Sequence, residues 1–183
     1  MGYTTNFTGS LNITPPLSPE QTAYINQFRL TRRMKRDTEI TATRPDPIRE
    51  AVGLPLGEQS GYFVGAAGFA GQEEGWGGHA AIGVLDYNAP PAGQPGLWCQ
   101  WEVSEDGNLQ WDEGEKFYSY TEWLEYLIQH FFAPWGKTLN GSIHWDGEDS
   151  EDRGMIWVKN NEVQAIQDTI TNECPFDAEG DGE

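Results

Sequence analysis

The densest group of chemically active side chains is an acidic run, DGEDSED, at residues 146–152. Alternate carboxylates in this run could supply the oxygen ligands that Ca²⁺ prefers. An EF-hand loop, however, needs Gly at its sixth position and Glu at its twelfth, where this chain has Glu151 and Trp157. We therefore predict a solvated hairpin loop with no bound metal. As a candidate acidic surface for a partner it offers Glu148, Asp149, Glu151 and Asp152.

Nucleophilic catalysis needs a serine or cysteine beside a histidine base. The chain has no G-x-S-x-G motif, and the histidines that could serve Cys99 are remote in sequence: His79, His130 and His144. No carboxylate pair stands out for glycoside chemistry. We therefore name no catalytic residue, metal or cofactor, and favour a non-enzymatic function over an enzymatic one.

A glycine-rich stretch occupies residues 62–95. Gly65, Gly68 and Gly71 recur at every third position, whereas a dinucleotide-binding loop needs G-x-G-x-x-G between a buried strand and a helix, so we exclude that site. We predict two short strands, Tyr62–Val64 and Ile82–Tyr87, joined by a flexible tip. The end of the second strand forms either a ligand site or an ordinary turn, through Asp86, Tyr87 and Asn88.

Five of the eleven basic residues lie between residues 29 and 36. Cations at the end of a helix are stabilised by the helix macrodipole, and we favour this interpretation. The alternative is a local site for a phosphate or a carboxylate. The candidate basic patch consists of Arg29, Arg32, Arg33 and Arg36.

The charge of the chain is distributed unevenly. Residues 1–50 carry seven Lys+Arg and five Asp+Glu (+2), whereas residues 51–183 carry four and twenty-four (−20), which together make −18. A field of this sign repels nucleic acid and anionic membranes, and it suits a basic protein partner. The alternative, that acidity serves solubility alone, stays open.

Length and hydropathy favour one cytoplasmic domain. No apolar run approaches the roughly 20 residues that span a bilayer, and no signal-peptide pattern is present. We expect a single domain over residues 1–170, with residues 62–95 as an insertion and residues 171–183 as an acidic, disordered tail.

Two patterns organise the first part of the chain. Apolar and polar residues alternate over 3–13, which predicts a strand with one buried face. Ser18, Pro19 and Gln21 then form a capping box, which predicts a helix from residue 19 to about residue 36.

The second part of the chain has clearer patterns. We predict a hairpin of 97–103 with 109–112, then a helix from a capping box at Ser119 and Glu122 to a stop at Gly136. A strand over 139–146 follows. A last hairpin turns at Asn160 and Asn161 between strands over 153–159 and 163–167.

These elements predict an α+β fold with a ferredoxin-like β-α-β-β-α-β scheme, an antiparallel-rich sheet with two helices on one face, and an extra C-terminal hairpin. The other face could bind a planar or sugar-like ligand, or a partner protein. Alternatively, the glycine-rich insertion folds over it. The candidate residues on that face are Trp98, Gln100, Asn140, His144 and Trp157.

The strings MGYTTNF, QPGLWCQW and EWLEYLI make the chain resemble a group of small uncharacterised proteins of bacteria and bacteriophages. The resemblance implies a recurring domain and a phage or mobile-element origin, and it carries no activity. We expect an acidic binding protein that engages a host protein, in one version as a DNA mimic against a nucleic-acid-binding or defence enzyme. The alternative is a small-molecule-binding or hydrolytic domain that uses the glycine-rich 65–88 loop and the open sheet face.

Overall fold

The computed structural model describes residues 2–66, 83–168 and 175–176. Contacts divide the chain into two compact units: unit 1 is Met1–Pro16 with Gln100–Glu183, and unit 2 is Leu17–Cys99. The single domain expected from the sequence therefore stays a prediction. The tip of the glycine-rich stretch, with His79, and nearly all of the expected tail lie outside the described residues.

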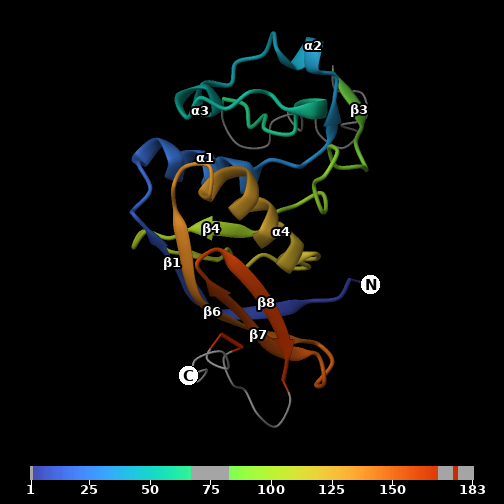
Figure 1. Ribbon diagram of the computed structural model, residues 1–183. Coiled ribbons are helices and arrows are strands. Elements are labelled where there is room, and N and C mark those ends of the chain that lie inside the picture. Colours follow the sequence, from blue (N-terminus) through green and yellow to red (C-terminus); the bar gives the residue numbers. More distant parts are fainter. Residues whose placement is uncertain (1, 67–82, 169–174, 177–183) are drawn as a thin grey trace. The chain divides into compact units, whose positions relative to one another are not determined.

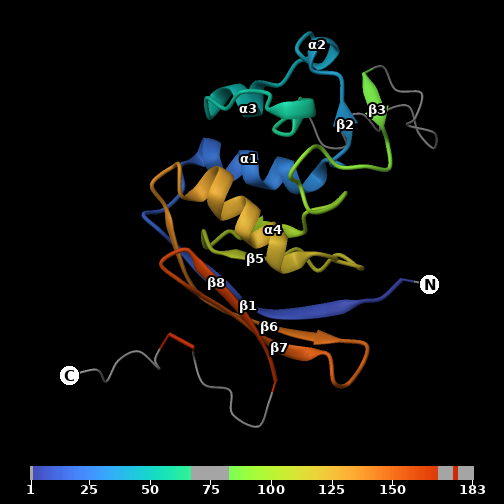
Figure 2. The same cartoon turned by 45° about the vertical axis from the view of Figure 1, so that its right-hand side comes forward.

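Unit 1 is built on a six-stranded sheet in which every neighbouring pair is antiparallel (Figures 1 and 2). In spatial order the strands are β4 (Trp101–Val103), β5 (Leu109–Trp111), β1 (Thr5–Thr14), β6 (Thr138–Gly147), β7 (Arg153–Lys159) and β8 (Glu162–Gln167). The prediction of a mixed α+β fold with an antiparallel-rich sheet is confirmed. The ferredoxin-like scheme is wrong, because the strand order differs and extra strands are present.

The pairing of β1 with β6 explains that order. The two strands are the longest in the sheet and pair from Thr5↔Gly147 to Thr14↔Thr138. In this register two pairs of buried apolar residues face each other across the strands, Phe7 with Trp145 and Ile13 with Leu139. Cross-strand apolar pairs on one face stabilise a particular register, and here they join the two ends of unit 1.

One face of the sheet is covered by α4 (Tyr120–Leu127) and its π-helical continuation η3 (Ile128–Phe132) (Figure 2). Phe131 and Phe132 in this continuation are both fully buried. The predicted helix is confirmed, but its capping box is wrong. Ser119 has a left-handed backbone (φ 54°), and its side chain makes no cap hydrogen bond.

An aromatic cluster forms the core beside the start of α4. The Phe7 ring meets four others edge-on at centroid distances of 4.8–5.8 Å: Trp101, Trp111, Phe117 and Tyr120. The Nε1–H of Trp101 donates to the Tyr120 carbonyl oxygen at 2.9 Å. Burial of the ring of Phe117 against this cluster draws the loop before α4 into tight turns, which accounts for the left-handed Ser119.

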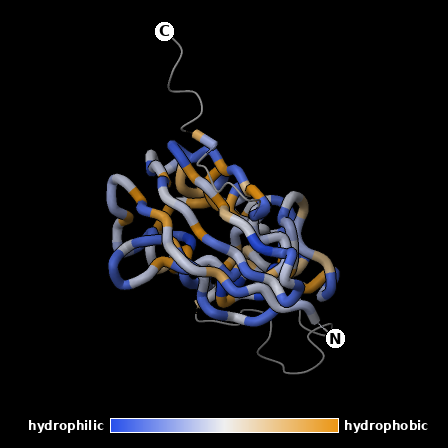
Figure 3. The backbone as a smooth tube through the Cα atoms, turned by 90° about the horizontal axis from the view of Figure 1, so that it is seen from below, coloured by the Kyte–Doolittle hydropathy of each residue, from blue (hydrophilic) through white to orange (hydrophobic). Residues whose placement is uncertain are grey.

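Both hairpins predicted in unit 1 are present. β4 pairs with β5, and β7 pairs with β8 around Asn160 and Asn161, whose φ angles are 50° and 70°. The first strand is shorter than predicted, because the Leu97 carbonyl oxygen accepts a bond from the Arg33 N–H in unit 2. Buried and more exposed residues alternate along β7, as one-sided burial requires. Figure 3 shows hydrophilic and hydrophobic residues following one another along the tube of the chain.

Unit 2 contains α1 (Pro19–Leu30), α2 (Thr38–Thr41), α3 (Pro47–Ala51), a 3-10 turn η1 (Glu58–Ser60) and a small sheet of β2 (Lys35–Arg36) with β3 (Val84–Asp86). The capping box at Ser18 and Gln21 is confirmed. The predicted helix end near residue 36 is wrong, because Thr31 is already extended. Residues 62–64 form no strand, although the second predicted strand contains β3.

No helix in the described part of the chain is both long enough and apolar enough to cross a lipid bilayer.

Candidate partner-binding site

The acidic loop, residues 146–152, is held in place by the N-terminal segment of the chain. The Tyr3 hydroxyl donates to Asp152 Oδ2 at 2.7 Å and accepts from the Asp149 N–H at 3.1 Å. Thr4 N–H donates to Glu148 Oε1 at 2.7 Å. Three of the four predicted acidic candidates are therefore positioned by residues that precede β1.

Two further hydrogen bonds, both accepted by side-chain carboxylates, stabilise the loop. The Glu151 N–H donates to Asp149 Oδ1 at 3.0 Å, and Asp152 Oδ1 accepts from Trp145 Nε1–H at 3.0 Å. An Asp side chain that bonds the backbone two residues on stabilises a turn. The loop thus joins β6 to β7 as predicted, and Glu148, Asp149 and Glu151 are exposed.

Two exposed tyrosines lie beside the acidic loop. Tyr3 is 37% exposed and Tyr118 is 54% exposed, and the hydroxyl of Tyr118 accepts the Tyr3 N–H at 3.1 Å. The hydrogen bond that Tyr3 donates to Asp152 raises the pKa of Tyr3, so the phenol keeps its proton there. We call the set the tyrosine–acid surface: Tyr3, Tyr118, Glu148, Asp149, Glu151 and Asp152.

The negative charge belongs almost entirely to the unit that carries this surface. Unit 1 contains 4 Lys+Arg and 20 Asp+Glu (−16), and unit 2 contains 7 and 9 (−2), which together give the −18 of the chain. Clustered charge of one sign raises the encounter rate with partners of the other sign.

The sheet face opposite α4 carries three of its predicted candidates. Asn140 and His144 lie on the same side of β6. Trp157 on β7 is paired with Ser142, which lies between them. Asn140 Oδ1 accepts the Asn160 N–H at 2.9 Å, and His144 Nε2 lies 3.4 Å from Asp168 Oδ2. Both polar side chains therefore make contacts within unit 1. Whether the insertion covers this face stays a prediction.

The other two candidates for that face belong to no strand. Trp98 belongs to unit 2 and to no strand. Gln100 lies at the start of unit 1, where its Nε2–H donates to the Glu115 carbonyl oxygen at 2.9 Å. That all five residues share one face stays a prediction.

The arginines of the basic patch are dispersed within unit 2. Arg33 and Arg36 are 1% and 3% exposed, and their guanidinium groups lie over the Phe28 and Phe63 rings at 4.1 and 5.0 Å. Arg33 also donates to the carbonyl oxygens of residues 61 and 63. Arg29 alone is in the last turn of α1, where the macrodipole interpretation applies.

Arg32 joins the basic patch to the predicted turn motif. Its guanidinium lies 4.0 Å from the Tyr87 ring centroid, and its Nη2–H donates to Asn88 Oδ1 at 3.4 Å. Asp86 Oδ1 accepts the Asn88 N–H at 2.9 Å, which is the ordinary turn contact expected as one alternative.

Sequence reasoning missed the tyrosines. The alternation over 3–13 assigned Tyr3 to the buried face, whereas β1 begins at Thr5 and Tyr3 is exposed. Tyr118 stood in a loop without a pattern. Among the described residues, no group of three or more His, Cys, Asp or Glu side chains is placed to hold a metal ion.

Comparisons of the chain with protein-family models, with curated proteins and with solved structures find no match.

Proposed function

We propose that the chain is a non-enzymatic acidic binding protein that engages a basic surface on a protein partner through the tyrosine–acid surface. The observation that carries the proposal is a pair of exposed tyrosines that are bonded to each other, of which Tyr3 is also bonded to the acidic loop. Tyrosine is enriched among the residues that dominate binding energy at interfaces, because it offers a large amphipathic area with few rotatable bonds.

Pre-ordering supports the same role. A loop whose side chains are already held by hydrogen bonds loses little conformational freedom on binding, so more of the contact energy appears as affinity. The bonds from Tyr3 and Thr4 to Asp152 and Glu148 hold this loop before any partner arrives. The charge of −16 on unit 1 then favours a partner rich in Lys and Arg.

A capture experiment with two charge-matched variants tests the proposal. Immobilised chain is exposed to a bacterial lysate at low and moderate salt. The surface variant combines Tyr118→Ser, Glu148→Gln and Asp149→Asn. The control combines Glu105→Gln and Asp106→Asn, at the tip of the β4–β5 hairpin, with Tyr87→Ser in unit 2, so that both variants lose two charges and one tyrosine.

We expect one or more basic proteins to be retained by the wild-type chain and by the control, and lost from the surface variant. Equal loss from both variants would mean that overall charge causes retention and would overturn the proposal. Failure of the wild-type chain to retain any protein at either salt concentration would also overturn it.

The narrower version is DNA mimicry against a host enzyme, which fits a phage-encoded protein. Carboxylates that replace phosphates would occupy the partner's nucleic-acid site, so duplex DNA should displace the captured protein. Retention that is unaffected by excess duplex DNA would leave a binding protein of another kind.

A further inference from the structure

Strands β1 and β5 separate along part of their length. They pair at Leu11↔Leu109. Continued antiparallel pairing would place Gly9 opposite Trp111 and Phe7 opposite Glu113. At that position there is instead a hollow of about 210 Å³. Its lining comes from both strands and the loop after β5: Phe7, Thr8, Gly9, Gln110, Trp111 and Glu113.

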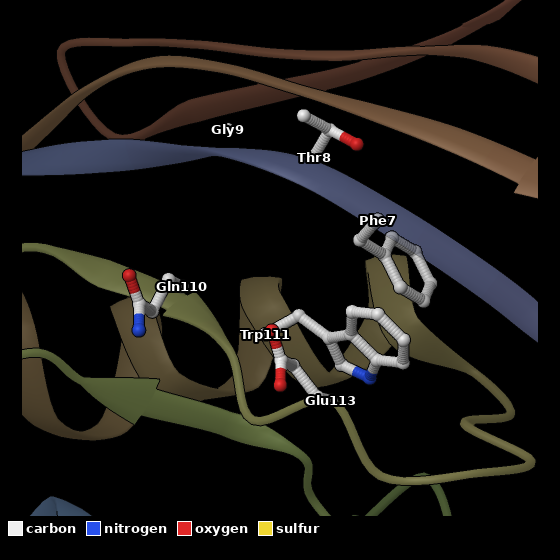
Figure 4. Close-up of a pocket in the computed structure, with 6 residues that line it drawn as sticks. All are labelled: Phe7, Thr8, Gly9, Gln110, Trp111 and Glu113. Atoms are coloured by element: carbon white, nitrogen blue, oxygen red, sulfur yellow. The ribbon is translucent and has the colours of Figure 1, made fainter.

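Figure 4 shows Trp111 and Glu113 next to each other, with Phe7 reaching toward them from β1. The indole is held in place, because its Nε1–H donates to the Gly114 carbonyl oxygen at 3.2 Å and to Gln100 Oε1 at 3.4 Å. The Phe7 and Trp111 rings meet edge to face with centroids 5.4 Å apart. The hollow thus has a rigid aromatic wall.

Glu113 supplies a carboxylate beside that wall. Its backbone is left-handed (φ 65°), which is uncommon for a residue other than glycine. The neighbouring Gly114 N–H donates to Asp112 Oδ1 at 2.8 Å, and this bond supports the turn. The Glu113 side chain itself is exposed, so its charge is available to a ligand.

The charges around the hollow favour a positively charged ligand. Among the described residues, those that line the hollow include no Lys or Arg. From residue 100 to residue 115 the chain carries six Asp+Glu and no Lys+Arg. An aromatic face beside a carboxylate attracts cations, and a planar guanidinium can stack on the ring while its N–H groups bond the carboxylate.

We propose that this hollow binds the guanidinium group of an arginine side chain, stacked on Trp111 and hydrogen-bonded to Glu113. The source of the arginine is the basic partner, and in this respect the inference rests on the proposed function.

Capped arginine amide is the probe, and capped citrulline amide, its neutral near-isostere, is the control. Each is titrated into the ¹⁵N-labelled full chain at low salt, and the Trp111 indole N–H signal is followed after assignment with the Trp111→Phe variant. We expect a saturable shift with arginine and none with citrulline. Equal shifts with both probes, or no saturable shift with arginine, would overturn the inference.

Two variants locate the binding. Glu113→Gln should weaken arginine binding about threefold or more, since an exposed ion pair contributes on this scale. Glu115→Gln removes the same charge from the same loop outside the hollow and should leave the affinity unchanged. Equal weakening by both variants would show that binding depends on the overall negative charge and would overturn the inference. Methyl β-glucoside serves as a sugar probe, and a saturable shift with it but not with arginine would also overturn the inference.

The outcomes separate the two proposals. Arginine binding that persists when the capture experiment fails would leave the hollow as a guanidinium site without a protein partner. Capture by the tyrosine–acid surface with no arginine binding would retain the proposed function and remove this inference.

Discussion

Tyr3 and Asp152 lie 149 residues apart in the sequence and are joined by a hydrogen bond of 2.7 Å. The same hydroxyl accepts the Asp149 N–H, so the Tyr3 side chain holds both Asp149 and Asp152 of the acidic loop. The first residues of the chain therefore determine the geometry of a loop near its other end.

The variant Tyr3→Phe tests this dependence. It keeps the ring and removes the hydroxyl, so the Asp149 N–H loses its acceptor and should exchange with solvent faster. Amide hydrogen exchange measured by NMR checks this. The Glu151 N–H, which bonds Asp149 Oδ1, should respond less. Unchanged protection of Asp149 would show that the turn is ordered without Tyr3.

The variant Gly9→Ala tests the close approach of the two central strands. Gly9 has φ +110°, and a Cβ there would lie 2.7 Å from the Ser142 carbonyl oxygen. Backbone strain and the clash together should lower the free energy of unfolding by about 1–3 kcal/mol, measured with urea. Gly107→Ala, at φ +83° with open space around it, isolates the strain and should cost less. Equal losses of unfolding free energy in the two variants would mean that the structure relieves the clash at Gly9.

The variant Asn161→Ala tests the turn between β7 and β8. The Asn161 amide accepts the Leu139 N–H at 2.7 Å and donates to the Lys137 carbonyl oxygen at 2.9 Å. Losing both bonds and forcing alanine to φ 70° should cost about 1–3 kcal/mol in unfolding. Asn161→Gly accepts that φ and should restore part of the loss. A glycine variant no more stable than alanine would contradict the role of backbone strain.

His130 predicts how stability responds to acid. Burial lowers the pKa of His130, whose ring stacks on Tyr126 with centroids 4.0 Å apart. As pH falls, His130 therefore binds a proton at a higher pH in the unfolded chain than in the folded chain. The contribution is complete above the ordinary histidine pKa of about 6.5 and is lost as pH falls through the folded pKa. Urea unfolding at pH 7.5 and 5 should show less loss of stability on acidification for His130→Gln than for the wild-type chain. An identical loss of stability in both proteins would contradict this contribution of His130.

Local periodicity was sufficient for most individual elements. The alternation in β1 and β6, the three-and-four spacing in α4 and the Asn-Asn turn each depend on neighbours in sequence, and each appears where predicted. Helix ends were less predictable. α1 ends at Leu30 because Thr31 caps it and Arg33 is buried beneath the segment around Phe63, which no pattern in the helix encodes.

The amino-acid sequence by itself determined the acidic character of the chain, the α+β class and the position of the acidic loop, because composition and period are local properties. Only the tertiary structure decided which strands are neighbours, since a buried face does not specify the strand that pairs with it. The same long-range pairing brings Tyr3 and Tyr118 to the acidic loop and separates β1 from β5 beside Glu113. Both candidate sites therefore arise from contacts between residues more than 100 positions apart, beyond the reach of any local pattern.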